Sequence, residues 1–316
     1  MDAVAGETLQ VYFLGTAGAL PTVHRNPACF LVRRGADTLL FDCGEGAQQQ
    51  MMRAQTGFTV DAVFVTHWHA DHYLGLFGLV QTLAFNGRSH PLTVYGPPGI
   101  DGIVHVIEHL STATMGFSVT GRVLKPGEEV WFDGYAIRAF GTRHGMASLG
   151  YVLVEDPRPG RFDREGAIAL GVRPGPLFGR LQRGNAVTVE VDGVPREVRP
   201  DEVLGPPRPG RSVAYTGDTR PVDLARAGVP EGLDLLIHDA TYDDADAERA
   251  AGVHHATAGE AGEAAARIGA KRLALVHLSS RYTSTAGHLR DAAARFNGQV
   301  LVPDDLAMLE VPFSDR

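Results

Sequence analysis

The stretch FVTHWHADHYLG, residues 64–75, places three histidines and an aspartate within six positions, directly after an apolar run. His67 and His69 are two residues apart on extended chain, so both side chains can point to one side. Asp71 and His72 follow at the turn into a predicted helix. These side chains can reach two points a few Å apart, which suits a pair of metal ions separated by about 3.5–4 Å. Imidazole and carboxylate donors without cysteine are typical of catalytic zinc.

Three other apolar runs also end in a residue that can bind a metal. IRAFGTRH ends at His144, SVAYTGD ends at Asp218 and LALVH ends at His277. If these strands end at the same edge of a sheet, their last side chains would lie close to His67, His69, Asp71 and His72. Taken singly, Asp71 could be only a helix cap and Asp218 only a turn residue. His144 alone is typical of a loop histidine and His277 of a core histidine, so the set as a whole is what favours metal binding.

The rest of the chain alternates between strand-like and helix-like segments. Apolar residues at helical spacing predict helices over residues 72–86, 102–114, 257–270 and 284–297. Short apolar runs that end in glycine or polar residues predict strands. These runs are LQVYFLG, CFLVRR, TLLFDCG, AVFVTH, LTVYGPPG, YAIRAFGTRHG, LGYVLVED, SVAYTGDT, LDLLIHDATY, RLALVHLSS, QVLVPD and LAMLEV. The order predicts two similar halves, separated by a segment of different composition.

That segment, residues 156–211, is rich in proline, glycine and arginine. It carries ten arginines and eight acids, whereas the whole chain has a net charge of −8, so the remainder carries −10. Within residues 157–183, six arginines stand against two acids. We expect an inserted arm with one short helix and one hairpin, outside the core. The arginines predict a basic surface, although a run of charges is also typical of a merely solvated face.

Composition limits the class of protein and its expected location. The chain has 316 residues, of which 44% are hydrophobic and 21% charged, as in ordinary globular proteins. No apolar run is long enough for a transmembrane helix, and the N-terminus lacks a signal-peptide pattern. We therefore expect a cytoplasmic protein with no membrane partner. Cys29 and Cys43 are expected to be free, buried thiols.

The order of the candidate ligands resembles a known superfamily. His67-x-His69-x-Asp71-His72, followed by His144, Asp218 and His277, is similar to the metallo-β-lactamase pattern. More specific segments resemble the ribonuclease Z family of tRNA 3′-processing endonucleases; they are FLGTAGALPTVHRNP, LFDCGEGAQQQMMR, YTGDTRP, LLIHDATY, HHATAGEA and VHLSSRY. The resemblance covers nearly the whole chain. It implies an α/β fold, a four-layer αββα sandwich over residues 1–316, with the basic exosite arm of residues 156–211 inserted in it.

The resemblance also implies roles for the metal ligands. One zinc ion would be held by His67, His69 and His144, and a second by Asp71, His72 and His277. Asp218 would bridge the two ions of each subunit, and manganese is accepted by the same donors. Asp71 is also the family's catalytic base. The metals lower the pKa of a water that attacks phosphorus, and they offset the charge that develops there.

The leaving group needs a proton, and the resemblance implies where it comes from. His255 in HHATAG matches the family's proposed donor, and Asp239 in HDAT matches a glutamate that orients it. Aspartate is one methylene shorter than glutamate. His254 is the competing candidate for the donor.

Substrate binding is implied in the same way. The segment GVRPGPLFGRLQRG resembles the family's tRNA-gripping exosite, with its Gly-Pro motif at Gly175 and Pro176. Its cations are Arg173, Arg180 and Arg183. The family acts as homodimers on precursor tRNA, and cleavage leaves a 3′-hydroxyl on the tRNA and a 5′-phosphate on the trailer. Residues 21–26 carry Val23 where many members have lysine, so the resemblance does not imply how 3′-CCA is treated.

Two other functions are compatible with part of the pattern. A small-molecule hydrolase of the same superfamily, such as a phosphodiesterase or lactonase, would use the same metals but has little use for a basic arm. A non-catalytic RNA-binding protein would not be expected to keep all seven candidate ligands. Both features favour the endoribonuclease.

Overall fold

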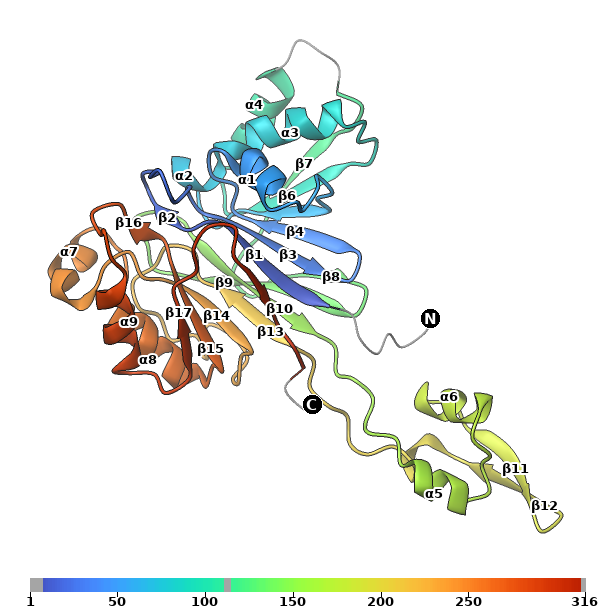
Figure 1. The fold of residues 1–316 in the computed structure, drawn as a ribbon. Coiled ribbons are helices and arrows are strands. Elements are labelled where there is room, and N and C mark those ends of the chain that lie inside the picture. The colour runs from blue at the N-terminus through green and yellow to red at the C-terminus, as the bar shows by residue number, and fades with distance from the viewer. Residues whose placement is uncertain (1–7, 111–114, 314–316) are drawn as a thin grey trace. The chain divides into compact units, whose positions relative to one another are not determined.

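The computed structural model describes residues 8–110 and 115–313. Its contacts divide these residues into two compact units, one made of residues 8–154 and 211–313 and a smaller one made of residues 155–210. Figure 1 labels the elements of both units. In the part of the chain described, no helix has the length and apolar character needed to cross a membrane.

The larger unit contains two seven-stranded sheets. The first has the order β18-β1-β3-β4-β5-β6-β7, antiparallel from β18 to β4 and parallel from β4 to β7. Its strands are β1 (Leu9–Gly15), β3 (Cys29–Arg34), β4 (Asp37–Phe41), β5 (Ala62–Phe64), β6 (Leu92–Gly96), β7 (Val119–Val123) and β18 (Met308–Glu310). The chain therefore returns to this sheet at its C-terminal end.

The second sheet has the order β17-β15-β14-β13-β10-β9-β8, with β13, β14, β15 and β17 parallel. Its strands are β8 (Glu129–Phe132), β9 (Tyr135–Gly141), β10 (Leu149–Glu155), β13 (Ser212–Tyr215), β14 (Leu235–Asp239), β15 (Arg272–Val276) and β17 (Gln299–Leu301). A short parallel pair, β2 (Ala17–Gly18) with β16 (Leu278–Ser279), joins segments that follow β1 and β15.

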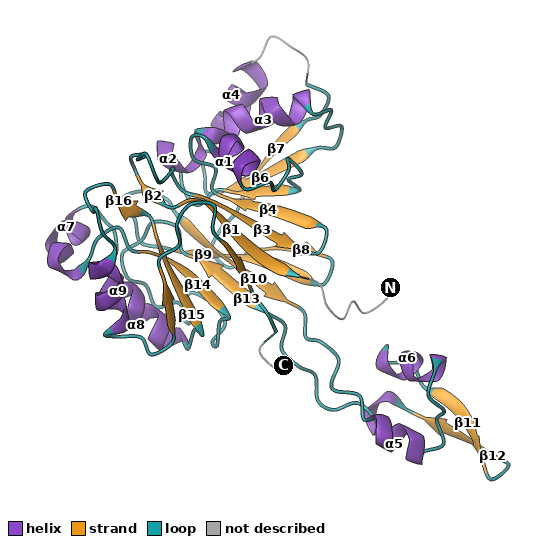
Figure 2. Cartoon of the chain, in the orientation of Figure 1, coloured by secondary structure: helices purple, strands orange, loops and turns teal. Residues whose placement is uncertain are grey.

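Alternating side chains build the layers of the larger unit. In β3, Phe30 belongs to a buried cluster shared with the second sheet, whereas Leu31 belongs to a cluster on the opposite face. That opposite face is covered by α1 (Ala47–Arg53), α3 (Gly75–Phe85) and α4 (Ile100–Leu110). The outer face of the second sheet is covered by α8 (Ala258–Ile268) and α9 (Ala286–Ala293). Figure 2 shows the resulting helix–sheet–sheet–helix order, which confirms the predicted αββα sandwich.

The predicted segments are confirmed with two differences in organisation. The helix predicted over 102–114 corresponds to α4, and residues 111–114 lie outside the described residues. The interpretation of two halves separated by residues 156–211 is wrong. Those residues are inserted between β10 and β13. These two strands pair directly with each other, from Tyr151↔Tyr215 to Val154↔Ser212. The pattern of a strand does not reveal which strand it will pair with, so the insertion point was misplaced.

The smaller unit has its own hydrophobic cluster. It contains α5 (Arg164–Ala169), α6 (Pro176–Gln182) and a hairpin of β11 (Val187–Val191) and β12 (Val194–Val198). Asp192 and Gly193 both have positive φ, as expected for an Asp-Gly hairpin turn. Residues from both helices and the hairpin pack together, including Ala167, Val172, Leu181, Val187 and Val198. The prediction of one short helix was wrong, because Gly175 and Pro176 begin a second one.

Candidate metal centre

The loop after β5 carries the first candidate ligands. His69 is the extended N-cap residue of the short helix α2 (Ala70–Tyr73), so Asp71 lies in the first helical turn and His72 follows it. The backbone of Cys43 fixes this turn, since its amide donates to the His72 carbonyl at 2.7 Å and its carbonyl accepts from the Gly75 amide at 2.9 Å. A Cβ on Gly75 would lie 1.9 Å from the Gly44 carbonyl oxygen, so only glycine permits this approach.

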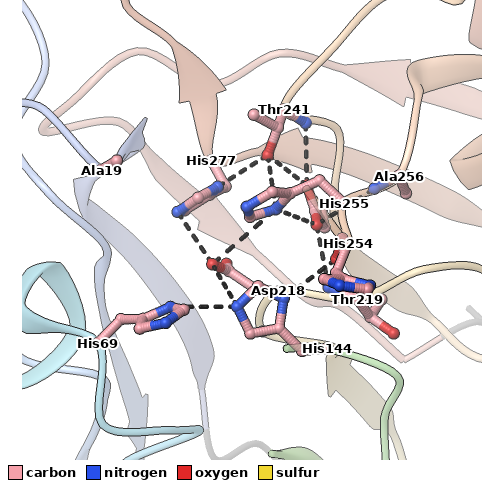
Figure 3. Close-up of polar contacts among 12 residues, drawn as sticks. Ala19, His69, His144, Asp218, Thr219, Thr241, His254, His255, Ala256 and His277 are labelled. Carbon is pink, nitrogen blue, oxygen red and sulfur yellow. Dashed lines mark hydrogen bonds and ion pairs between the residues drawn. The ribbon is translucent and has the colours of Figure 1, made fainter. Parts of the chain in front are cut away.

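One cluster consists of His67, His69, His144 and Asp218. His69 Nδ1 lies 2.9 Å from His67 Nε2 and 3.1 Å from His144 Nε2. Figure 3 shows His69 and His144 meeting beside Asp218. Ligands of a tetrahedral zinc ion, each about 2.0–2.1 Å from the metal, lie about 3.3 Å apart. The spacing of these nitrogens therefore suits one ion.

A second cluster consists of Asp71, His72 and His277. His277 Nε2 lies 3.3 Å from Asp71 Oδ2 and 3.3 Å from Asp218 Oδ2. His72 Nε2 lies 3.4 Å from each of the same two carboxylate oxygens. Asp218 Oδ2 also lies 3.6 Å from His67 Nε2. One carboxylate thus faces ligand atoms of both clusters, and the structure brings together all seven residues singled out in the sequence.

Two buried polar atoms at this site have no hydrogen-bond partner among the described residues. They are His72 Nε2 and Asp218 Oδ1. Leaving a buried polar atom unsatisfied costs about 1–3 kcal/mol, and both atoms are good metal ligands. The donor set and these two atoms therefore fit divalent metal ions.

The histidines of the first sheet are held from behind by Asp42, which is fully buried. Its carboxylate accepts a hydrogen bond from His72 Nδ1 at 2.7 Å, from the Thr66 amide at 2.7 Å and from the Tyr215 hydroxyl at 2.7 Å. Thr66 Oγ1 lies 2.9 Å from Asp42 Oδ2 and 3.1 Å from His67 Nδ1. Hydrogen bonds at Nδ1 fix the tautomer that leaves Nε2 free for a metal. Asp42 therefore braces the loop that carries these candidate ligands.

A similar arrangement lies at the end of β14. Asp239 is fully buried, and its carboxylate accepts from the amides of Thr219 at 3.0 Å and Thr241 at 2.9 Å. Thr241 Oγ1 lies 2.7 Å from Asp239 Oδ1 and 2.8 Å from His277 Nδ1. Thr66, Thr241 and Tyr215 were not predicted from the sequence. For the threonines, the available signal was their place within the ligand-bearing segments FVTH and HDAT.

The two candidate proton donors, His255 and His254, lie in different surroundings. His255 Nδ1 is 2.9 Å from Asp239 Oδ2, and its ring stacks on His277 with centroids 5.0 Å apart. The imidazole of His254 is exposed, and its backbone carbonyl accepts from His144 Nδ1 at 3.0 Å. The geometry therefore favours His255 over His254. His255, Asp218 and His277 also form a third cluster whose side chains could hold a metal ion.

The pKa shifts at the site differ from one group to the next. Burial lowers the pKa of His67 and of His144, so both imidazoles remain neutral, as metal ligation requires. Burial opposes ionisation of Asp218, yet His277 and His72 outweigh it and lower the pKa of that carboxyl. At His255, burial is outweighed by Asp239, which raises the pKa of the imidazole to about 9. An imidazole charged at neutral pH can donate a proton.

The loop after β1 closes the site from another direction. The Ala19 amide donates a hydrogen bond to Asp71 Oδ2 at 2.9 Å, and Ala19 has a positive φ of 52°. A Cβ on Gly18 would lie 2.6 Å from the carbonyl oxygen of His277. Neither residue was predicted from the sequence, where the available signal was the glycine-containing run TAGAL.

The arm residues singled out in the sequence lie in the smaller unit. Gly175 has a φ of 143° and precedes α6, and nothing lies within 4 Å of a Cβ placed there. Three of the arm's arginines are exposed and form no ion pair with any residue in the described ranges: Arg173, Arg180 and Arg183. Arg196 and Arg199, in contrast, pair with Glu202 and Asp201 at 3.3 and 2.9 Å.

Comparisons with known proteins bear on this site. A family model described as Metallo-beta-lactamase superfamily matches residues 23–180, and one described as Beta-lactamase superfamily domain matches residues 203–278. Ribonuclease Z of Halorubrum lacusprofundi is 51% identical over 310 residues, which cover 98% of this chain and 99% of the relative. Ribonuclease Z of Myxococcus xanthus is 49% identical over 308 residues, which cover 97% and 99%.

Solved structures share the fold. The short form of human tRNase Z superposes with a TM-score of 0.69 at 24% identity, covering 96% of this chain and 100% of that one. A diphosphatase of the PhnP family superposes with a TM-score of 0.61 at 17% identity, covering 96% and 98%. Because a tRNase and a diphosphatase share it, the fold by itself does not select a substrate.

Proposed function

The chain belongs to the ribonuclease Z family of the metallo-β-lactamase superfamily, a family of metal-dependent endoribonucleases in tRNA 3′ processing, and on this premise we propose which residues carry its chemistry. His67, His69 and His144 would hold one zinc ion, and Asp71, His72 and His277 would hold the other. Asp218 would contribute its carboxylate to both. The observation that carries this assignment is the Asp218 carboxylate, which faces ligand atoms of both clusters at 3.3–3.6 Å. Manganese fits the same donors.

When bound, such a metal pair activates a water for attack on phosphorus and offsets negative charge on the phosphoryl oxygens. Asp71 is placed to take the proton of that water. Burial works against its charge, but the neighbouring imidazoles of His277 and His72 outweigh burial and lower the pKa of its carboxyl, so Asp71 stays ionised. The Ala19 amide holds Asp71 Oδ2 from the opposite side at 2.9 Å.

His255 protonates the leaving 3′-oxygen of the tRNA. Its Nδ1 hydrogen is held by Asp239, which leaves Nε2 as the nitrogen that can give up a proton. The shorter side chain of Asp239, compared with the family's glutamate, still reaches His255 at 2.9 Å. The products are then a tRNA with a 3′-hydroxyl and a trailer with a 5′-phosphate.

The inserted arm binds the tRNA through its arginines. Arg173, Arg180 and Arg183 are exposed cations without acidic partners among the described residues. Such arginines are available to phosphates and supply affinity that does not depend on sequence. The arm is an insertion in one metallo-β-lactamase domain, and the working unit is a cytoplasmic homodimer.

The small-molecule alternative has no observation of its own in its favour. Fold likeness to a diphosphatase is compatible with it, but the relatives that are about half identical over nearly the full chain are ribonucleases Z. The scaffold alternative would need a degraded site, and the two clusters are complete.

The direct test is incubation with a 3′-extended precursor tRNA, followed by mapping of both product ends. We expect a single cut that leaves the stated termini, and the same RNA ending in CCA measures the consequence of Val23. Hydrolysis of bis(p-nitrophenyl) phosphate without any cut in the RNA would overturn the assignment of substrate. No hydrolysis of either compound in the presence of zinc or manganese would overturn the catalytic site.

A further inference from the structure

Thr241 contacts both the residues proposed to bind metal and the residues proposed to donate a proton. The residue is buried and lies just after β14, separated from it by Ala240. Its hydroxyl oxygen lies 2.7 Å from Asp239 Oδ1, 2.8 Å from His277 Nδ1 and 3.1 Å from His255 Nδ1. Figure 3 shows Thr241 above the His255 and His277 rings, with a dashed contact to each. One hydroxyl therefore touches a predicted metal ligand, the predicted proton donor and the carboxylate behind that donor.

The hydrogens of this network can be assigned from donor and acceptor capacity. A hydroxyl has one hydrogen and two lone pairs, and an ionised carboxylate only accepts. The Thr241 hydroxyl therefore donates to Asp239, and the Thr241 amide donates to the same oxygen at 2.9 Å. The lone pairs of the hydroxyl then accept from Nδ1 of His277 and, as a longer second contact, from Nδ1 of His255.

Two consequences follow for the neighbouring rings. With its hydrogen on Nδ1, His277 turns the lone pair of Nε2 toward Asp71 and Asp218, each 3.3 Å away. Because Thr241 occupies Asp239 Oδ1, the other oxygen, Oδ2, is left to hold His255 at 2.9 Å. Loss of the hydroxyl would free His277 to change tautomer or rotate, and would free the Asp239 carboxylate to turn away from His255.

We infer that Thr241 is a positioning residue with two separable effects, one on metal affinity through His277 and one on leaving-group protonation through Asp239 and His255. The second effect rests on the proposed function, whereas the first can be measured without RNA. No atom of Thr241 needs to touch the substrate.

Thr66 provides a matched control in the other half of the site. Its hydroxyl lies 2.9 Å from Asp42 and 3.1 Å from His67 Nδ1, so it also joins a buried carboxylate to a predicted ligand. Within the described ranges, the Thr66 side chain forms no hydrogen bond with His255. Thr66→Val should therefore disturb metal binding alone, and Thr241→Val should disturb both effects.

The experiment compares three variants, Thr241→Val, Thr66→Val and Thr241→Ser, with the unaltered protein. Valine keeps the shape of threonine but removes the hydroxyl, and serine keeps the hydroxyl. Zinc affinity is measured by competition with a chromogenic chelator. Turnover and KM are measured at saturating zinc for a 3′-extended precursor tRNA and for bis(p-nitrophenyl) phosphate. The second substrate releases p-nitrophenolate, which leaves without needing a proton from the enzyme.

We expect both valine variants to bind zinc about 10–100-fold more weakly, as is typical when a partner behind a ligand is lost. Saturating zinc should restore most of the Thr66→Val turnover on both substrates. For Thr241→Val it should restore most of the turnover on the diester, while kcat on the tRNA stays roughly tenfold or more below the starting protein because proton donation is impaired. KM for the tRNA should change little. Thr241→Ser should recover both properties.

Three results would overturn the inference. Unchanged zinc affinity in Thr241→Val would remove the effect through His277. Full recovery of tRNA cleavage at saturating zinc, or equal residual loss on both substrates, would remove the effect through His255. Failure of serine to rescue would show that packing, not the hydroxyl, is what matters.

Two precautions keep the outcomes apart. If Thr241→Val does not fold, as judged by its melting curve, Thr241→Ala removes the same hydroxyl with a smaller side chain and takes its place. If the unaltered protein hydrolyses the diester but no precursor tRNA, the proposed substrate fails while the zinc-affinity effect is still measured.

Discussion

The candidate metal centre has two halves, a first half around Asp42 and a second half around Asp239. They contain the same kinds of residue but are expected to support different chemistry. Asp42 and Asp239 are both fully buried, and each accepts a hydrogen bond from a threonine hydroxyl that also contacts a histidine Nδ1. Behind the first sheet, Asp42 with Thr66 serves His67 and His72, whose side chains are fully buried. Behind the second sheet, Asp239 with Thr241 serves His277 and the partly exposed His255.

This difference between the halves predicts two kinds of mutational defect, one in metal binding and one in proton donation. The Asp42 network holds only predicted ligands, and the Tyr215 hydroxyl completes it at 2.7 Å. Damage there should weaken metal binding and be reversed by added metal. The Asp239 network divides its hydrogen bonds between a ligand and a group that can carry a proton, so damage there should leave a defect that metal does not repair.

The largest expected effect comes from a residue on which both halves depend. Asp71→Ala removes a ligand and the proposed base, and should lower kcat by about 10⁴-fold or more on tRNA. The loss should be equally severe on bis(p-nitrophenyl) phosphate, because the base acts on the attacking water and not on the leaving group. Steady-state rates on both substrates test this, and near-normal rates in Asp71→Ala would refute the mechanism.

The next effect should appear in the second half alone. His255→Ala should lower kcat on precursor tRNA by about 10²–10³-fold, within the range of general acid catalysis. It should reduce hydrolysis of the activated diester much less, since p-nitrophenolate needs no proton. His254→Asn is the control, because asparagine tolerates its positive φ and the carbonyl that holds His144 is kept. A larger loss in His254→Asn than in His255→Ala would reverse the assignment of the donor.

A smaller and reversible effect is expected in the first half. Asp42→Asn keeps the shape of the side chain but weakens the bond to His72 Nδ1 and should reduce zinc affinity by about 10–100-fold. Titration with zinc should return most of its activity on both substrates. Asp239→Asn, the matched change in the second half, should keep a defect on tRNA at saturating zinc. The comparison between the halves fails if the two variants recover equally.

The smallest effect concerns the arm, where the chemistry is untouched. Replacing Arg173, Arg180 and Arg183 with alanine should raise KM for precursor tRNA roughly tenfold and flatten its dependence on salt, since fewer phosphate contacts release fewer counterions. The activated diester should be hydrolysed at the normal rate. Arg196→Ala with Arg199→Ala is the control, because these arginines already pair with acids. Equal KM changes in the two variants would assign the effect to net charge and not to the unpaired arginines.

The sequence predicted which candidate ligands lie together better than it predicted the residues that hold them in place. His67, His69, Asp71 and His72 lie in one segment, and the order of the remaining ligands matched a known pattern. The supporting bonds join distant residues: Asp42 reaches Thr66 across 24 positions and Tyr215 across 173. Nothing local in the sequence marks a tyrosine on the second sheet as the partner of an aspartate on the first. The place of the arm was missed for the same reason, because strand pairing is not written in the pattern of any one strand.

The most direct measurement is anomalous diffraction from crystals of the protein grown with zinc. We expect two peaks about 3.5–4 Å apart on either side of the Asp218 carboxylate. One peak should lie among His67, His69 and His144, and the other among Asp71, His72 and His277. A single peak, or a second peak held by Asp218, His255 and His277, would contradict the assignment, because His255 would then be a ligand and not the proton donor.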